Sequence, residues 1–168
     1  VSQNTSLINL DCEDNQITSL DLSSNILLEF LICDNNRLSS LDVSGCTVLD
    51  SLFCQGNRLT ILDLTNNINL KDLNCGVNQL ASLDVSNNSA LINFICGKNG
   101  LTSLDLRNGN NINISSFSAL YNPNLTCISV DDATWSAANW TNIDAHTSFS
   151  DDCDAVVDAP KTYVPDDN

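Results

Sequence analysis

Apolar and polar residues follow one another along most of this chain in a pattern that repeats every 21 residues. Each unit opens on a leucine, places further apolar residues three and five positions later, and then an asparagine. The step is shared by three columns of residues, which are Cys12, Cys33, Cys54, Cys75 and Cys96; Asn15, Asn36, Asn57, Asn78 and Asn99; and Asp21, Asp42, Asp63, Asp84 and Asp105. A fixed period of this length indicates a stacked repeat and not a globule with one closed core.

The alternation within each unit predicts a short strand. In the first unit Leu10 and Cys12 share one face and Asp11 takes the other. Successive coils would then pair as parallel strands about 4.8 Å apart, and stacking would bury the apolar side that one coil cannot bury alone. We expect the asparagines at the strand ends to bond backbone groups of the turns in one column down the stack.

Each coil carries this strand signature twice. The first half, Leu-x-x-Leu-x-Cys-x-x-Asn, begins at Leu7, and the second repeats it as Ile17-x-x-Leu20-x-Leu22-x-x-Asn25. The pattern resembles the short nested class of bacterial leucine-rich repeats, called the IRREKO type, and more loosely the internalin-like repeats, over roughly residues 1–130. We therefore expect a mainly β repeat solenoid with parallel strands on two sides, weak curvature, and a small C-terminal cap with a short helix.

The register divides the chain into three parts. Residues 1–120 are predicted to form the solenoid, with five full coils from Leu7, a partial coil before it, and further repeats upstream of a truncated N-terminal end. Residues 121–153 are predicted to form the cap, with a helix within residues 131–140. Residues 154–168 contain two prolines and several aspartates and are interpreted as a linker or tail.

The charge narrows the classes of partner. Six basic residues against twenty-one acidic ones give a formal charge of −15. Binding to nucleic acid depends on basic residues that neutralise phosphates, and anionic membranes also attract cationic surfaces, so neither is an expected partner. No apolar run is long enough to span a membrane. Cationic proteins, divalent ions and uncharged glycans remain open.

The eight cysteines are five in the 21-residue column, Cys46 at another position of its coil, and two near the C-terminal end. Those in the 21-residue column point inward and are predicted to act as small apolar packers, without the spacing of a zinc site. Cys46 stands where other coils have Asn25, Asn67 and Asn88. The family resemblance implies a disulfide between Cys127 and Cys153 in the cap, and hence an oxidising compartment, so that a secreted or cell-surface location is expected.

The aspartate column faces outward and admits more than one interpretation. Neighbouring serine and threonine hydroxyls and backbone N–H groups could satisfy the carboxylates, which is the interpretation we favour. Bridging by calcium or another cation is the weaker alternative, and a regular face that recognises an ordered surface is a third. No metal or cofactor is expected, and the alternative calcium ligands are Asp21, Asp42, Asp63, Asp84 and Asp105.

The outward residues around the cysteine column vary from coil to coil, as in the recognition surfaces of stacked repeats. Phe30, Ile32 and Phe53 are expected to be neighbours, with Ile95 further along the stack. Exposed apolar side chains grouped in this way mark partner sites, although packing that stiffens the sheet is an equal alternative. An acidic group beside the patch would add selectivity; it consists of Asp11, Glu13, Asp14 and Asp34.

No catalytic motif is present, and His146 is the only histidine, so no enzyme activity is expected. The resemblance implies a recognition role of adhesion type at a cell surface or matrix, and we favour a protein partner bound by a monomer through the varied face. Two alternatives remain: a calcium-stabilised structural spacer, and a polysaccharide attachment module of a larger enzyme.

Overall fold

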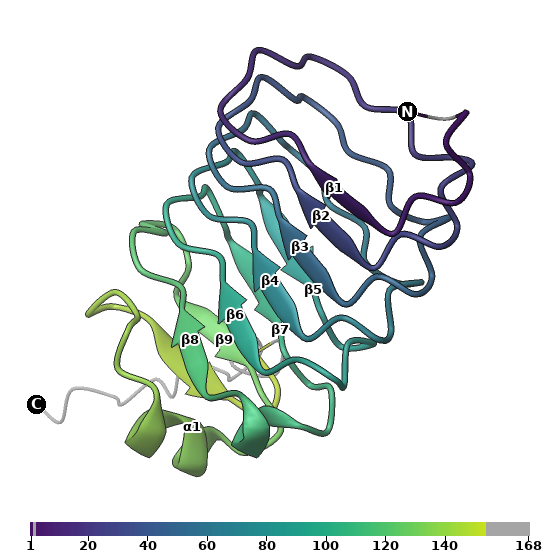
Figure 1. Cartoon of the computed structure of the whole chain (residues 1–168). Coiled ribbons are helices and arrows are strands. Elements are labelled where there is room, and N and C mark those ends of the chain that lie inside the picture. Colours follow the sequence, from purple (N-terminus) through teal and green to yellow (C-terminus); the bar gives the residue numbers. More distant parts are fainter. Residues whose placement is uncertain (2, 154–168) are drawn as a thin grey trace, which may run out of the picture.

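The computed structural model describes residues 1 and 3–153 and stacks them as a β-solenoid whose coils lie one on another along a single axis (Figure 1). One side of the stack carries a six-stranded parallel sheet, which we call the Cys-side sheet. Its strands, in spatial order, are β1 (Asn9–Asp11), β2 (Phe30–Ile32), β3 (Ser51–Phe53), β4 (Asp72–Asn74), β6 (Asn93–Ile95) and β8 (Ser116–Ser118). The expected mainly β leucine-rich-repeat solenoid is confirmed.

The register of this sheet follows the sequence period. Leu31 pairs with Leu10 on one side and Leu52 on the other, each 21 residues away. From β6 to β8 the step grows to 23, since Phe94 pairs with Phe117. Every central strand residue from Leu31 onward is buried, as are Cys33, Cys54, Cys75 and Cys96, so the cysteine column lies in the core.

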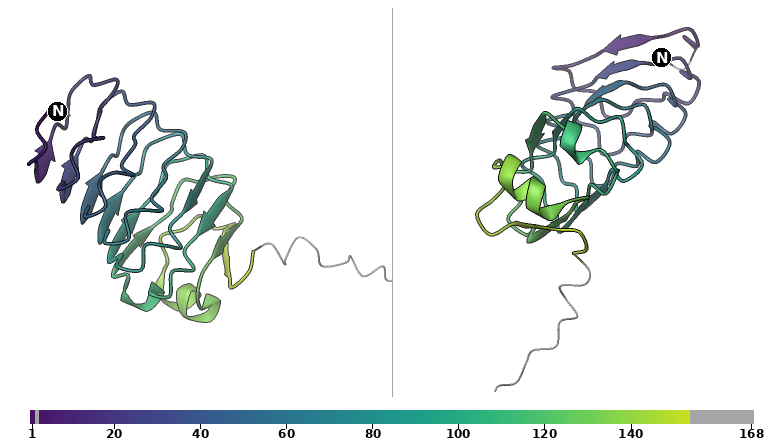
Figure 2. Two further views of the ribbon diagram at one scale, coloured as in Figure 1. Left: turned by 90° about the vertical axis from the view of Figure 1, so that its right-hand side faces the viewer. Right: turned by 90° about the horizontal axis from the view of Figure 1, so that it is seen from below.

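A second, four-stranded parallel sheet, the Asp-side sheet, lies on the opposite side (Figures 1 and 2). It contains β5 (Ser82–Asp84), β7 (Ser103–Asp105), β9 (Cys127–Ser129) and β10 (Ser148–Ser150), in the order β10-β9-β7-β5. The equivalent segments 19–22, 40–43 and 61–64 are not strands. In these coils the Cys sides are paired as strands, whereas the Asp sides are not. A hollow of about 490 Å³ lies there, lined in part by Ser40, Leu41 and Ile61.

The asparagine column predicted at the strand ends is present. The amide of Asn57 donates to the carbonyl oxygens of Cys33 at 3.0 Å and Cys54 at 3.1 Å. Its Oδ1 accepts the backbone N–H of Leu38 at 3.0 Å. One side chain thus joins two successive coils and satisfies buried groups that would otherwise be costly to bury.

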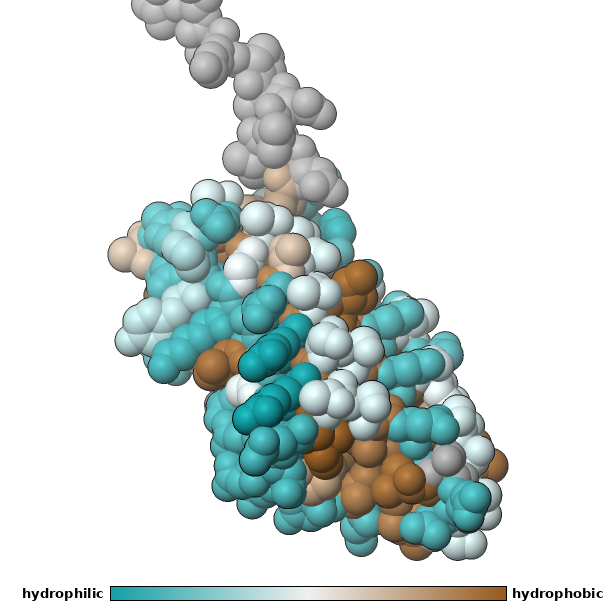
Figure 3. All heavy atoms as spheres, turned by 90° about the horizontal axis from the view of Figure 1, so that it is seen from above, coloured by the Kyte–Doolittle hydropathy of each residue, from teal (hydrophilic) through white to brown (hydrophobic). Residues whose placement is uncertain are grey.

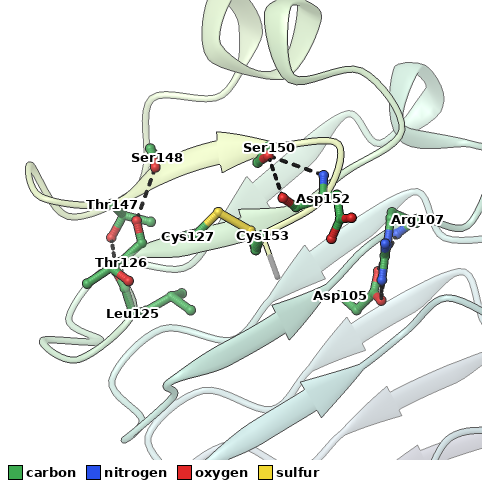
Figure 4. Close-up of a disulfide and its surroundings, with 10 residues drawn as sticks. All are labelled: Asp105, Arg107, Leu125, Thr126, Cys127, Thr147, Ser148, Ser150, Asp152 and Cys153. Carbon is green, nitrogen blue, oxygen red and sulfur yellow. Dashed lines mark hydrogen bonds and ion pairs between the residues drawn. A yellow bond between two sulfur atoms is a disulfide. The ribbon is translucent and has the colours of Figure 1, made fainter. Parts of the chain in front are cut away.

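The C-terminal end combines strands, a helix and a disulfide. Helix α1 (Ala133–Asn139) begins after Asp132, whose Oδ1 accepts the Trp135 N–H at 2.9 Å, and a 3-10 turn, η1 (Asn111–Asn113), precedes β8. Trp140 stacks on Phe117 with ring centres 4.4 Å apart, which closes this end of the core. A disulfide joins Cys127 to Cys153, the pair that the resemblance implied (Figure 4). The predicted domain boundaries stay predictions, and the proposed linker at 154–168 lies outside the described residues.

The first coil is less enclosed than the others. Its inward side chains are only partly buried, and they are Leu7, Leu10, Cys12, Ile17 and Leu20. Figure 3 shows apolar side chains gathered on the part of the surface away from the C-terminal end of the described chain. Among the described residues, no helix has the length and apolar character needed to cross a bilayer.

Candidate partner-binding face

The outward surface of the Cys-side sheet, which we call the Cys face, brings the predicted apolar residues together. Phe30 and Ile32 project from the same side of β2, and Ile32 pairs in register with Phe53 of β3. The Phe30 side chain is 41% exposed, while Ile32 and Phe53 are half-buried by their neighbours. The three form one compact cluster, the Phe30 patch, on the rigid surface of the sheet.

Ile95 does not belong to this cluster. Its strand β6 pairs with β4, where Asn74 stands opposite Ile95 and separates it from Phe53. A polar band crosses β3 and β4 between the two: the Asn74 amide donates to the Gln55 side chain at 3.1 Å, and Lys71 pairs with Asp50 at 2.6 Å. Ile95 therefore belongs to a separate part of the Cys face.

Acidic residues lie beside the Phe30 patch. Asp11 stands opposite Ile32 in the register of β1 and β2, and Asp34 follows β2 by two residues. The pKa of Asp34 is raised, first by burial and then by repulsion from the carboxylates of Glu13, Asp14 and Asp11, against a backbone hydrogen bond from Gln55 that lowers it. These four carboxylates therefore form one negative field at the edge of the patch.

The aspartate column faces outward, and its carboxylates are satisfied from within the chain. The backbone N–H two residues on donates to each of them, as Ser44 does to Asp42 at 2.9 Å and Thr65 to Asp63 at 3.0 Å. Hydrogen bonds from the hydroxyls of Ser44 and Thr65 lower the pKa values of Asp42 and Asp63. These contacts support the structural interpretation of the column. No group of three or more His, Cys, Asp or Glu within residues 1 and 3–153 is placed to hold a metal ion.

The cysteine column supplies packing and no reactive thiolate. Burial raises the pKa of Cys33 and of Cys75 to about 12, and it raises the pKa of Cys54 well above its ordinary value. A thiol with such a pKa stays protonated near neutral pH, and the thiolate is the nucleophile and metal ligand. The buried cysteines therefore act as small apolar side chains.

Sequence reasoning missed one column of the Cys face. The residue two positions after each cysteine of the 21-residue column adopts a left-handed backbone, with φ between 52° and 68° at Asp14, Asn35, Gly56, Val77 and Lys98. Tyr121 continues this column with φ 63°. Asp, Asn and Gly are the residue types that tolerate this conformation, so the first three members were a usable signal. Tyr121 lies 23 residues after Lys98, and a strict 21-residue count would have pointed to Ala119.

Three solved bacterial structures are similar to this chain. The functional domain of InlJ from Listeria monocytogenes, which includes a cysteine ladder, is 36% identical, with a TM-score of 0.63 over 79% of this chain and 28% of that one. An internalin, InlF, from the same species is 22% identical, with a TM-score of 0.62 over 89% and 49% of the two chains. A leucine-rich-repeat protein of Leptospira interrogans is 18% identical, with a TM-score of 0.59 over 89% and 38%.

The chain thus spans less than half the length of each of these structures. No protein-family model matches it, and no curated protein matches it in sequence. The two likenesses below 25% identity show the fold alone. The InlJ domain shares the fold and includes a cysteine ladder, and this chain has a column of buried cysteines. The chain is therefore a leucine-rich-repeat solenoid of the bacterial, internalin-like kind.

Proposed function

We propose that this chain is a non-enzymatic recognition module that binds a protein partner through the Phe30 patch. The observation that carries the proposal is the 41% exposed Phe30 beside Ile32 and Phe53 on a fully hydrogen-bonded sheet. Aromatic side chains held in this way supply much of the energy of protein interfaces. The internalin-like neighbours support a protein-interaction repeat module in general.

The surroundings of the patch favour a partner with basic groups. The four neighbouring carboxylates would attract lysine or arginine side chains around an apolar centre and would raise the association rate at low salt. Since the sheet is hydrogen-bonded on both sides of β2, we expect little backbone movement on binding. We also propose that the module belongs to a secreted or cell-surface protein of adhesion type, because the disulfide Cys127–Cys153 requires an oxidising compartment.

The test compares two surface variants in a cell-binding assay. Fluorescently labelled wild-type protein is titrated onto bacterial cells and, separately, onto host cells. The double variant Phe30→Ser, Phe53→Ser and the control variant Ile61→Ser are titrated in the same way. Ile61 is 74% exposed on the Asp side, so its variant removes an apolar side chain that is more accessible than Phe30 from the other face. The double variant should bind at least about tenfold more weakly, while the control should bind as the wild type does.

Treatment of the cells identifies the kind of partner. Prior digestion with protease should abolish binding, and prior periodate oxidation of glycans should leave it intact. Equal binding by the double variant and the wild type, with both folded by circular dichroism, would show that the patch is not the site. Loss after periodate alone would favour the glycan alternative. A large fall in melting temperature with EDTA, without any cell binding, would favour the calcium-stabilised spacer.

A further inference from the structure

A second hollow lies on the Cys face beyond the polar band, at the level of β4, β6 and β8. Its volume is about 300 Å³. One wall includes Ile95 and Ser118, the other is formed by Val77, Lys98 and Tyr121, and Gln55 and Leu120 close the ends. We call this hollow the glycine trough, because Gly76 and Gly97 line its floor.

The two glycines are required by the close approach of successive coils. A Cβ atom at Gly97 would lie 2.8 Å from the carbonyl oxygen of Leu120, and one at Gly76 would lie 3.1 Å from that of Gly97. In the neighbouring coils the same column holds the longer side chains of Gln55 and Leu120. The floor of the trough is therefore backbone, which leaves room for a side chain from outside.

The outer wall is held in place by its backbone. Val77, Lys98 and Tyr121 have φ values of 53°, 56° and 63°. The Val77 N–H donates to Gly97 at 2.9 Å, and the Tyr121 N–H donates to the carboxylate of Asp144 at 3.0 Å. The side chains of Val77 and Tyr121 are nevertheless 44% and 63% exposed. A fixed apolar wall of this kind, open to solvent, is typical of an interaction site.

Lys98 gives the trough a charge opposite to that of the rest of the face. Its ammonium lies 5.6 Å from the centre of the Tyr121 ring, and in the described part of the chain no carboxylate forms an ion pair with it. Lys71, the other lysine of the face, is already paired with Asp50. The Cys face is thus acidic near the Phe30 patch and carries an available cation at the trough.

We infer that the glycine trough is a second contact point for the protein partner and takes an apolar side chain next to a carboxylate, which pairs with Lys98. This inference rests on the proposed function, since it describes another feature of the same partner. Strands are about 4.8 Å apart, so the trough lies some 10–15 Å from the patch. Both contacts fit within one standard interface of about 800 Å² on each partner.

Blocked peptides titrated into the whole, ¹⁵N-labelled chain provide the test. The probes are N-acetyl-Leu-Asp-Leu-amide and its uncharged counterpart N-acetyl-Leu-Asn-Leu-amide, with glucuronic acid as a sugar that carries the same charge. The aspartate peptide should shift the amide signals of Gly76, Gly97 and Tyr121 and bind about fivefold more tightly than the asparagine peptide at low salt.

Two matched variants locate the charge. K98Q should abolish the preference for the aspartate peptide, whereas R58Q, which removes one positive charge from an exposed position elsewhere, should keep it. The Y121A variant should weaken both peptides at least about fivefold. Shifts that match these expectations, with no comparable response to glucuronic acid, support the inference.

Other results overturn it without overturning the proposed function. These are no shift at the trough amides with either peptide, equal binding of the two peptides, an unchanged preference in K98Q, or a stronger response to glucuronic acid. Shifts confined to Phe30, Ile32 and Phe53 would also overturn it, while supporting the patch. If the trough binds as expected but the Phe30→Ser, Phe53→Ser variant keeps full cell binding, the patch proposal fails and the trough remains.

Discussion

Each coil has two halves with one shared sequence signature: the Cys half, which contains the column cysteine, and the Asp half, which contains the column aspartate. The two halves differ in the hydrogen bonds of their asparagines. Asn57, in the Cys half, donates to two cysteine carbonyls and accepts the Leu38 N–H through Oδ1. Asn67, in the Asp half, also donates to two carbonyls, those of Val43 and Cys46, but its buried Oδ1 has no hydrogen-bond partner among the described residues.

The difference extends to the outward faces. The Asp half repeats the same aspartate in every coil, and the carboxylate is used to bond the backbone two residues on. The Cys half forms a six-stranded sheet, and its outward residues vary from coil to coil. Apart from Gly109, it also contains all the residues with a left-handed backbone in the described chain. Where the core and the asparagine column hold the coils together, the outward side chains are free to vary, and recognition can be built on them.

The largest expected effect on stability distinguishes the asparagine column of the Cys half, represented by Asn57, from the asparagines of the Asp half, represented by Asn67. Asn57→Cys would leave the buried Leu38 N–H without a partner and would remove the hydrogen bonds to the carbonyls of Cys33 and Cys54, which keep those from Asn36 and Asn78. An unpaired buried donor costs about 1–3 kcal/mol and each lost hydrogen bond about 0.5–1.5 kcal/mol, so we expect a loss of about 3 kcal/mol in the free energy of unfolding. Asn67→Cys should lose about 1 kcal/mol or less, because it leaves no N–H unpaired and the carbonyls of Val43 and Cys46 keep their backbone donors. A cysteine, Cys46, already occupies the equivalent position of another coil. Urea unfolding under reducing conditions measures both, and equal losses would remove the distinction.

The cap disulfide should stabilise the Asp-side sheet more than the Cys-side sheet. It joins β9 to the residues after β10, and these two strands form the end of the Asp-side sheet. The two cysteines are 26 residues apart, and closing a loop of this size contributes about 3 kcal/mol in the chain-entropy account. Cys153→Ser should therefore lower the free energy of unfolding by about 3 kcal/mol. In hydrogen exchange, the amides of Leu106 and Val130 should lose more protection than those of Cys54 and Cys75.

Reductant supplies the control for this variant. It should destabilise the wild type to a similar extent and leave Cys153→Ser unchanged, because the other cysteines of the described chain are free thiols. A uniform loss of protection in both sheets would contradict a special role of the cap on the Asp side.

The sequence period was sufficient to predict the stack, the inward cysteines and the asparagine column, since each follows from equivalent residues at a constant step. It could not predict how far the Asp-side sheet extends. Residues 40–43 and 82–85 have the same sequence, Ser-Leu-Asp-Val, but only Ser82–Asp84 forms a strand. Pairing depends on the distance to the next coil, which the whole stack determines and the local residues do not.

The candidate site was predicted in part for a similar reason. The Phe30 patch lies on strands with a strict 21-residue step, so its neighbours could be counted from the sequence. The glycine trough depends on left-handed turns and on the two extra residues that bring Tyr121, in place of Ala119, beside Lys98. Backbone conformation at a turn and a change of step are set by contacts between coils, and a periodic count does not include them.

Asp34 on the Cys face should respond to pH in the direction opposite to Asp42 and Asp63 of the aspartate column. The pKa values of Asp42 and Asp63 are lowered by the hydrogen bonds from Ser44 and Thr65, so the stability that they contribute is complete above the ordinary pKa of 3.8 and is lost as the pH falls through the lowered values. The pKa of Asp34 is raised, mainly by burial, so stability is gained as the pH falls through its raised pKa.

Carbon-13 titration of the side-chain carboxyls, from about pH 2 to pH 6, measures these directions. Asp34 should titrate at a higher pH than Asp42 and Asp63. At neutral pH, Asp34→Asn should raise the urea midpoint and Asp63→Asn should lower it. A common midpoint for the three groups would contradict the expected difference between Asp34 and the two column aspartates.

The smallest expected effect concerns the left-handed column of the Cys half. Val77 is β-branched and has φ 53°, a conformation that costs an L-residue about 1–2 kcal/mol and that asparagine tolerates better. Val77→Asn should therefore raise the free energy of unfolding by about 0.5–1 kcal/mol.

Val48 is the matched control: it is exposed to a similar extent, 39% against 44%, but lies at the other edge of the coil and has no positive φ. Val48→Asn should change stability by less than about 0.5 kcal/mol in either direction. If thermal and urea unfolding show the same change for both variants, the turns of the Cys half store no more strain than those of the Asp half.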